Sequence, residues 1–141
     1  RAMAGMRIGY AIGNEELISK LKAVKFSYNS YTMNMPSIEA GVAAIEDDDY
    51  FKEIVGKIIT TREKAKEELK KLGFSCTDSK ANFLFASHKN IQASVIFEEL
   101  KKRKIFVRYF NKPRINNYLR ITVGTDDEMK QLYAALKEIL G

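Results

Sequence analysis

The sequence predicts a two-layer α/β fold of the α+β kind, in which helices cover one face of a small sheet. Three observations predict it. A stripe of apolar residues at helical spacing begins near Tyr50 and stops at Gly73, a residue that suits a left-handed helix cap. Short apolar runs typical of strands follow at residues 81–87, 105–110 and 118–124. The chain closes with a second amphipathic helix over residues 125–140.

Length and composition place the chain among ordinary globular proteins. Its 141 residues, 45% of them apolar and 30% charged, suffice for one compact domain with a hydrophobic core. No apolar run approaches the roughly 18 residues that cross a bilayer, and no secretory signal is recognisable. Cys76 is the single cysteine and His88 the single histidine, which excludes an internal disulfide and argues against a structural zinc site. We therefore expect a cytoplasmic protein without a bound metal and without a membrane partner.

The net charge of +6 raises the question of nucleic-acid binding, because clustered Lys and Arg release counterions from phosphates. The densest basic run, KKRK at residues 101–104, closes a predicted helix that carries Glu98 and Glu99 one turn earlier, as is typical of a solvated helix end. The acidic run EDDD at residues 46–49 favours a break between two helices and a cap for the second over a cation site. We expect no nucleic-acid partner.

For the first 45 residues the sequence predicts one strand followed by two helices. Residues Arg7–Ile12 are predicted as a short buried strand, and Asn14 as the start of a helix. After a turn-rich aromatic stretch, Pro36 predicts the first turn of a helix through Ile45, because proline is tolerated there. Any domain boundary is expected within or just after the long helix that follows.

The segment after Gly73 predicts a strand, a helix, a hairpin and a closing helix. The run ANFLFAS suits a central strand, and IQASVIFEELKKRK has helical periodicity. The runs IFVRYF and YLRITVG are predicted to pair as a hairpin around the loop NKPRINN. Thr125 and Glu128 have the spacing of a capping box at the start of the last helix.

Alternation along the two hairpin strands places two arginines on one face. In each strand every second residue is apolar and suits the core, which leaves Arg108 and Arg120 on the opposite face. A loop roughly symmetric about Arg114 brings the two arginines nearly opposite each other. Like charges directly opposite on paired strands cost a few tenths to about 1 kcal/mol, so we expect an anionic group between them. Planar guanidinium groups are well matched to a phosphate or a carboxylate.

The sequence pattern is also compatible with other roles for these arginines. Arg108 and Arg120 could each pair with a nearby acidic residue or extend into solvent, which is the common state of surface arginines. Arg7, beside a short apolar run, is likewise compatible with a structural ion pair. The pattern alone therefore predicts an anion-binding face and leaves the identity of the anion open.

Two segments carry a resemblance to a known family. AGMRIGYAIG at residues 4–13 and VRYFNKPRINNYLRITVGT at residues 107–125 closely resemble the C-terminal part of histidinol-phosphate aminotransferases, which are pyridoxal-phosphate enzymes of the aspartate aminotransferase fold type. The likeness extends over essentially the whole chain, because the long helix and the strand entry at Ala81 to Phe83 also fall in family order. AG-x-R-x-GY is shared by many aminotransferases, whereas the two-arginine hairpin ending in LRITVGT is more specific.

The resemblance implies that the chain is a C-terminal fragment of a longer enzyme. In this family the Schiff-base lysine lies slightly before the AG-x-R motif, a position that falls upstream of Arg1. The fragment is therefore expected to be inactive and not to retain pyridoxal phosphate. Residues 1–35 then correspond to a remnant of the large cofactor-binding domain, residues 36–72 to connecting helices and residues 73–141 to the small C-terminal aminotransferase domain.

The resemblance also implies roles for three arginines. Arg7 matches the family arginine that binds the phosphate of pyridoxal phosphate. Arg120 matches the arginine that takes the substrate's α-carboxylate in aminotransferases generally, and the phosphate of histidinol phosphate, which has no carboxylate, occupies that place. Arg108 then supplies the further positive charge that a dianion requires. No residue is assigned a catalytic or a metal-binding role.

The implied activity is transamination between glutamate and imidazole acetol phosphate in histidine biosynthesis, by an enzyme that the family implies to be a homodimer. Two rival interpretations remain. A threonine-phosphate decarboxylase or another small pyridoxal-phosphate aminotransferase would share this fold, because two arginines do not identify the amine attached to a phosphate. A non-catalytic interaction domain could also keep the fold. His88 is expected in an exposed loop, and Cys76 as a small packing residue near the domain seam.

Overall fold

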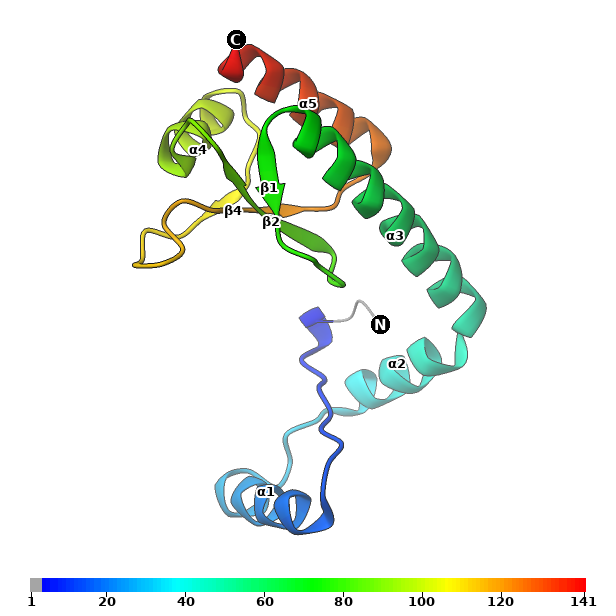
Figure 1. Cartoon of the computed structure of the whole chain (residues 1–141). Helices are drawn as coiled ribbons and strands as arrows, with labels where there is room; N and C mark the ends of the chain where they lie inside the picture. The colour runs from blue at the N-terminus through cyan, green and yellow to red at the C-terminus, as the bar shows by residue number, and fades with distance from the viewer. Residues whose placement is uncertain (1–3) are drawn as a thin grey trace. The chain divides into compact units, whose positions relative to one another are not determined.

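A computed structural model describes residues 4–141, and Figure 1 shows the helices and strands. The elements in chain order are a short 3-10 helix (Ala4–Met6), α1 (Glu15–Tyr28), α2 (Met35–Glu46), α3 (Asp48–Lys71), β1 (Phe74–Cys76), β2 (Phe83–His88), α4 (Ala93–Lys102), β3 (Arg108–Tyr109), β4 (Leu119–Thr122) and α5 (Asp126–Leu140). They form two compact units, unit 1 (residues 1–52) and unit 2 (residues 53–141). No helix within residues 4–141 is both long and apolar enough to cross a membrane.

The four strands of unit 2 form one antiparallel sheet in the order β1-β2-β4-β3. The interior strand β2 pairs with β1 through Phe74 opposite His88, and with β4 through Leu84 opposite Ile121. Burial alternates along β2, where Leu84, Ala86 and His88 are buried and the residues between them are partly exposed. Such alternation is expected of a sheet with one covered and one open face.

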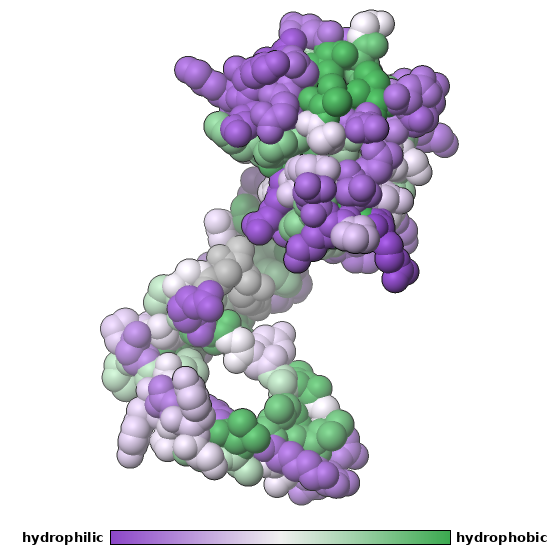
Figure 2. Space-filling model, turned by 90° about the vertical axis from the view of Figure 1, so that its left-hand side faces the viewer, coloured by the Kyte–Doolittle hydropathy of each residue, from purple (hydrophilic) through white to green (hydrophobic). Residues whose placement is uncertain are grey.

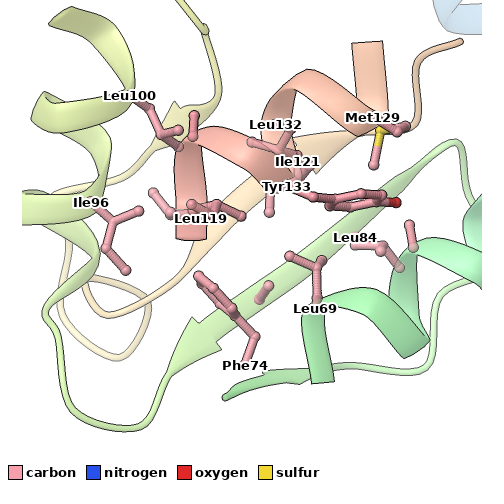
Figure 3. Packing of buried hydrophobic residues seen from close by; sticks show 14 of the residues in the cluster. Leu69, Phe74, Leu84, Ile96, Leu100, Leu119, Ile121, Met129, Leu132 and Tyr133 are labelled. Atoms are coloured by element: carbon pink, nitrogen blue, oxygen red, sulfur yellow. The ribbon is translucent and has the colours of Figure 1, made fainter. Parts of the chain in front are cut away.

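Helices α3, α4 and α5 cover the buried face of the sheet, and their apolar side chains meet those of the strands in one core (Figure 3). Leu69 of α3, Ile96 of α4 and Leu136 of α5 are completely buried. The other buried members of this core are Ala65, Phe74, Leu84, Ala86, Ala93, Leu100, Leu119, Ile121, Met129, Leu132, Tyr133 and Ala135. The predicted two-layer α/β fold is therefore confirmed.

The helix ends of unit 2 follow the predicted capping residues. The Glu128 carboxylate accepts a hydrogen bond of 2.7 Å from the Thr125 backbone N–H, and the Thr125 hydroxyl accepts one from the Glu128 backbone N–H, so the capping box forms. The bond from the Thr125 backbone lowers the pKa of Glu128. Gly73 follows α3 with φ +84°, and a Cβ there would lie 2.9 Å from Nε2 of His88, so both conformation and space require glycine.

The core contains one buried hydroxyl without a partner. The hydroxyl of Tyr133 has no hydrogen-bond partner among residues 4–141, and burial raises the pKa of this tyrosine to about 12. Because a desolvated hydroxyl without a hydrogen bond is unfavourable, we expect Tyr133→Phe to leave the free energy of unfolding at pH 7 unchanged or to raise it by about 1 kcal/mol.

The same variant is expected to resist alkaline pH better than the wild type. Tyr133 ionises near pH 10.0 in the unfolded chain and near pH 12 in the folded protein, so this residue's contribution to stability is lost as the pH rises through that window. Urea unfolding at pH 7 and at about pH 11 measures both effects. A loss of more than about 2 kcal/mol at pH 7 would show that the hydroxyl is hydrogen-bonded after all.

The described residues of unit 1 comprise the short 3-10 helix, α1, α2, the segments that join them and the first turn of α3. As predicted, Asn14 caps α1 and Pro36 lies in the first turn of α2, which Asn34 caps. Helix α1 buries none of its residues, and its apolar side chains Leu17 and Val24 are 61% and 67% exposed. Figure 2 shows apolar surface over this unit, in green in the lower part of the view. The apolar face of α1 is therefore not covered within unit 1.

The strand predicted over Arg7–Ile12 is wrong. From Ile8 to Ile12 the chain has no regular structure, and all but Ile8 of these residues are exposed. A strand is stabilised by hydrogen bonds to a neighbouring strand. The described residues of unit 1 include no strand with which this segment could pair.

The predicted strand at residues 105–110 is shorter in the structure, and one strand is additional. Only Arg108–Tyr109 pairs with β4. At the start of the predicted strand, the backbone N–H of Ile105 donates instead to the Leu100 carbonyl at the end of α4 (3.0 Å). Strand β1 has only three residues, too few for alternation to be recognised in the sequence.

The two charged runs have the predicted structural roles. The side chain of Asp47, between α2 and α3, accepts a hydrogen bond from the backbone N–H of Tyr50 (3.3 Å). At the end of α4, Glu99 pairs with Lys102 at 2.6 Å and with Arg103 at 2.9 Å. These local contacts are typical of a helix cap and of a solvated helix end.

Candidate anion-binding site

The hairpin of β3 and β4 brings the two predicted arginines together. Arg108 lies directly opposite Arg120 in antiparallel register, and Tyr109 lies opposite Leu119. Side chains alternate between the two faces of a strand, and Leu119 and Ile121 are buried in the core. Both arginines therefore lie on the face of the sheet that points away from the core, and the predicted register is confirmed.

An aromatic ring lies against each arginine. The guanidinium carbon of Arg120 is 5.1 Å from the centroid of the Phe83 ring, and that of Arg108 is 5.3 Å from the centroid of the Phe110 ring. Both distances are within the range of a cation–π interaction, which extends to about 6 Å. Phe83 reaches Arg120 from the neighbouring strand β2, whereas Phe110 directly follows the strand that carries Arg108.

Neither arginine is neutralised within the described part of the chain. Other arginines of this unit form ion pairs: Nε of Arg62 lies 2.9 Å from Oε1 of Glu63, and Nη1 of Arg103 lies 2.9 Å from Oε2 of Glu99. No acidic residue among residues 4–141 forms such a pair with Arg108 or Arg120. The Nε–H of Arg120 is buried and donates to no acceptor among these residues. The alternative in which an acidic neighbour binds each arginine therefore does not hold here.

Further aromatic residues complete this face. Phe85, directly opposite Arg120 on β2, stacks on Tyr118 with ring centroids 4.6 Å apart and ring planes 8° from parallel. Two positive charges thus lie among four aromatic rings, those of Phe83, Phe85, Phe110 and Tyr118. An apolar surround strengthens electrostatic attraction. The face can therefore bind one anionic group, phosphate or carboxylate, between two guanidinium groups.

Arg7 belongs to unit 1. Its side chain is exposed, and its backbone has a φ of +58°, in the left-handed region that is unfavourable for residues with a Cβ. The Ser37 hydroxyl donates to the carbonyl of the preceding residue, Met6, at 3.2 Å. Arg7 lines a groove together with Thr32, Asn34 and Ser37. Hydroxyl and amide side chains in that groove could share an anion with the guanidinium.

The expected exposed position of His88 is wrong. The histidine ends β2, is 8% exposed and packs edge-on against Phe74. Its Nδ1 accepts hydrogen bonds from the backbone N–H groups of Asn90 (3.3 Å) and Ile91 (3.1 Å), so the imidazole stabilises the turn that leads to α4. Cys76 packs partly buried against the core, and burial raises the pKa of its thiol.

The aromatic residues of this face were not assigned from the sequence, among them Phe83, which lies against Arg120. The signal was available, because alternation along β2 places Phe83 and Phe85 on the face opposite Leu84. What the sequence could not supply is the strand order, in which β4 lies between β2 and β3. That order places Phe83 next to Arg120.

Comparisons with known proteins agree with this architecture. Residues 1–136 match the family described as aminotransferase class I and II. A histidinol-phosphate aminotransferase of Brachyspira hyodysenteriae is 54% identical over 140 residues, which is 99% of this chain and 40% of that protein. The chain thus spans about 40% of the length of the curated relatives that it matches.

Two solved structures extend the comparison. The histidinol-phosphate aminotransferase from Clostridium acetobutylicum has a TM-score of 0.86 at 27% identity, over 99% of this chain and 42% of that chain. The one from Sinorhizobium meliloti, in complex with pyridoxal-5'-phosphate, has a TM-score of 0.82 at 29% identity, over 98% of this chain and 38% of that chain. The family match covers all but the last few residues, and we conclude that the chain belongs to the aminotransferase class I and II family.

Proposed function

We propose that this chain is the C-terminal part of a pyridoxal-phosphate-dependent enzyme that transfers an amino group between glutamate and imidazole acetol phosphate, the oxo form of histidinol phosphate. One observation carries the proposal: Arg108 and Arg120 lie opposite each other without an acidic partner among residues 4–141. Relatives that are 49% and 54% identical to the chain and bear the name histidinol-phosphate aminotransferase support it.

The arginine pair fits the phosphate of the substrate better than a carboxylate alone. A phosphate monoester carries nearly two negative charges at neutral pH and presents three acceptor oxygens. Two guanidinium groups on adjacent strands can engage more than one of those oxygens and balance both charges. In this proposal Arg120 and Arg108 bind the phosphate and fix the position of the amine, while neither arginine transfers a proton.

Arg7 fits the phosphate of the cofactor. Its guanidinium is exposed, it has no acidic partner among residues 4–141, and it borders the side chains of Asn34 and Ser37. We assign Arg7 to the phosphate of pyridoxal phosphate, where a fixed contact would hold the ring in place. When bound, the cofactor supplies an electron sink for the bond changes at the amine-bearing carbon.

The domain assignment follows from the same proposal. We assign residues 1–35 to the large cofactor-binding domain, residues 36–72 to connecting helices and residues 73–141 to the small C-terminal domain. We further propose that the intact enzyme is a cytoplasmic homodimer. The exposed apolar side chains of α1, Leu17 and Val24 among them, support the view that unit 1 packs against other protein in the intact enzyme.

An assay of the full-length protein that contains this chain tests the proposal. With pyridoxal phosphate and 2-oxoglutarate present, we expect histidinol phosphate to be converted to imidazole acetol phosphate with the release of one glutamate per turnover. Threonine phosphate is expected to stay intact. Carbon dioxide release from threonine phosphate would instead support the decarboxylase, and inactivity toward both amines would support a non-catalytic domain.

A further inference from the structure

We propose that Phe83 is a positioning residue that holds the guanidinium of Arg120 ready for the phosphate group. The inference rests on the proposed function, because it concerns the same anion-binding face. The contact joins two strands: Phe83 begins β2, Arg120 lies on β4, and the guanidinium carbon is 5.1 Å from the ring centroid.

The register explains why Phe83, and not its neighbour on the same face, has this role. Phe83 lies opposite Thr122, which makes it the diagonal neighbour of Arg120, and long side chains reach a diagonal neighbour in a sheet. Phe85 lies directly opposite Arg120, but its ring is stacked on Tyr118. The guanidinium of Arg120 is accordingly found against Phe83.

An aromatic ring can hold the guanidinium group of an arginine in place without neutralising its positive charge. A carboxylate partner would neutralise the guanidinium and accept its N–H groups, as Glu99 does with Arg103 at 2.9 Å. A ring face attracts the cation through its quadrupole and leaves those donors to a ligand. The Nε–H of Arg120 agrees with this arrangement: it is buried and has no acceptor among residues 4–141, so it is available to a ligand.

The two arginines differ in how firmly they are held. Arg120 lies on a strand that has neighbours on both sides, its side chain is only partly exposed, and its Nε is buried. Arg108 lies on the edge strand and is exposed. Loss of the Phe83 ring should therefore affect phosphate binding through Arg120 while the contact of Arg108 with Phe110 is left unchanged.

Phosphate titration of the full-length protein that contains this chain tests this inference, with inorganic phosphate as the probe. The signals of the arginine Nε–H groups in a nitrogen-15 NMR spectrum, assigned with single-arginine variants, report binding at each arginine separately. For Phe83→Leu we expect phosphate to bind about tenfold more weakly, the size of a largely desolvated cation–π contact. We also expect the Arg120 Nε–H signal of the phosphate-free variant to shift, because the ring face is lost.

Matched variants separate positioning from general packing. Phe83→Tyr keeps the ring and should bind phosphate within about twofold of the wild type. Phe85→Leu removes a ring from the same strand and the same face and keeps the position apolar. The Phe85 ring makes no cation–π contact with an arginine among residues 4–141, so this variant should also stay within about twofold. Phe83→Met removes the ring with little loss of apolar volume, and it replaces the leucine variant if that variant does not fold.

The outcomes distinguish this inference from the proposed function. If the wild type binds phosphate and loss of the Phe83 ring leaves its affinity unchanged, Phe83 has no positioning role while the anion site stands. An equal loss in Phe85→Leu would show general packing and would also overturn the inference. If phosphate moves neither the Arg108 nor the Arg120 signal in the wild type, the anion site itself is wrong, and the inference is overturned with it.

Discussion

Arg120→Gln is expected to raise the KM of the full-length protein for histidinol phosphate by about 30- to 150-fold, with a smaller change in kcat. The magnitude corresponds to about 2 to 3 kcal/mol, the loss of charge-assisted hydrogen bonds to one phosphate group. Glutamine keeps a planar polar group at this position, so the change removes the charge and most of the donors with little loss of volume. Steady-state kinetics with histidinol phosphate as the varied substrate give the values.

The same variant should stay within about 1 kcal/mol of the wild type in its free energy of unfolding. Removal of Arg120, which lies opposite Arg108 without an acidic partner among residues 4–141, relieves a repulsion of a few tenths to about 1 kcal/mol, and this gain offsets the lost cation–π contact with Phe83. A functional loss without a stability loss is the signature of a binding residue. Arg114→Gln, in the loop of the same hairpin, is the matched control and should change KM by less than about twofold. A strongly destabilised Arg120→Gln with unchanged KM would contradict the assignment.

Leu84→Ala is expected to lower the free energy of unfolding by about 3 kcal/mol, within the range of about 2.7 to 5 kcal/mol found for buried leucines. Leu84 is completely buried on the interior strand β2, opposite Ile121 and beneath the helices that cover the sheet. Truncation leaves a cavity that the surrounding strands and helices fill only in part. Urea unfolding followed by circular dichroism measures the change.

The control for this prediction lies in the same unit. Val95 is on α4 with its side chain 51% exposed, and Val95→Ala should change the free energy of unfolding by no more than about 0.5 kcal/mol. Similar losses in the two variants would mean that the core is not where the structure places it. A small loss in both would point to a loosely packed core around β2.

Much of unit 2 could be predicted because its signals are local. The apolar stripe of α3, its glycine terminator Gly73 and the capping box of Thr125 and Glu128 each depend on residues a few positions apart. The position of Arg108 opposite Arg120 could also be predicted, because a hairpin register follows from the alternation of two strands joined by a short loop. Such features require no knowledge of the rest of the fold.

The errors fall where distant residues decide the structure. A short apolar run such as Arg7–Ile12 forms a strand only when another strand lies beside it, and the residues of the run do not show whether such a strand is present. His88 follows a strand and precedes a turn, which suggests exposure, yet two backbone N–H groups and the Phe74 ring enclose it. The contact of Phe83 with Arg120 likewise depends on the strand order.

The central claim is that Arg108 and Arg120 bind the phosphate of the substrate. The most direct test is the ratio of kcat/KM for histidinol phosphate to kcat/KM for histidinol, a substrate that differs only by lacking the phosphate. In the wild-type full-length protein we expect a preference of about a thousandfold or more, as for sites built around a polar group. In the double variant Arg108→Gln, Arg120→Gln the two substrates should be used with similarly low efficiency. A double variant that keeps the wild-type preference would show that the phosphate is bound elsewhere.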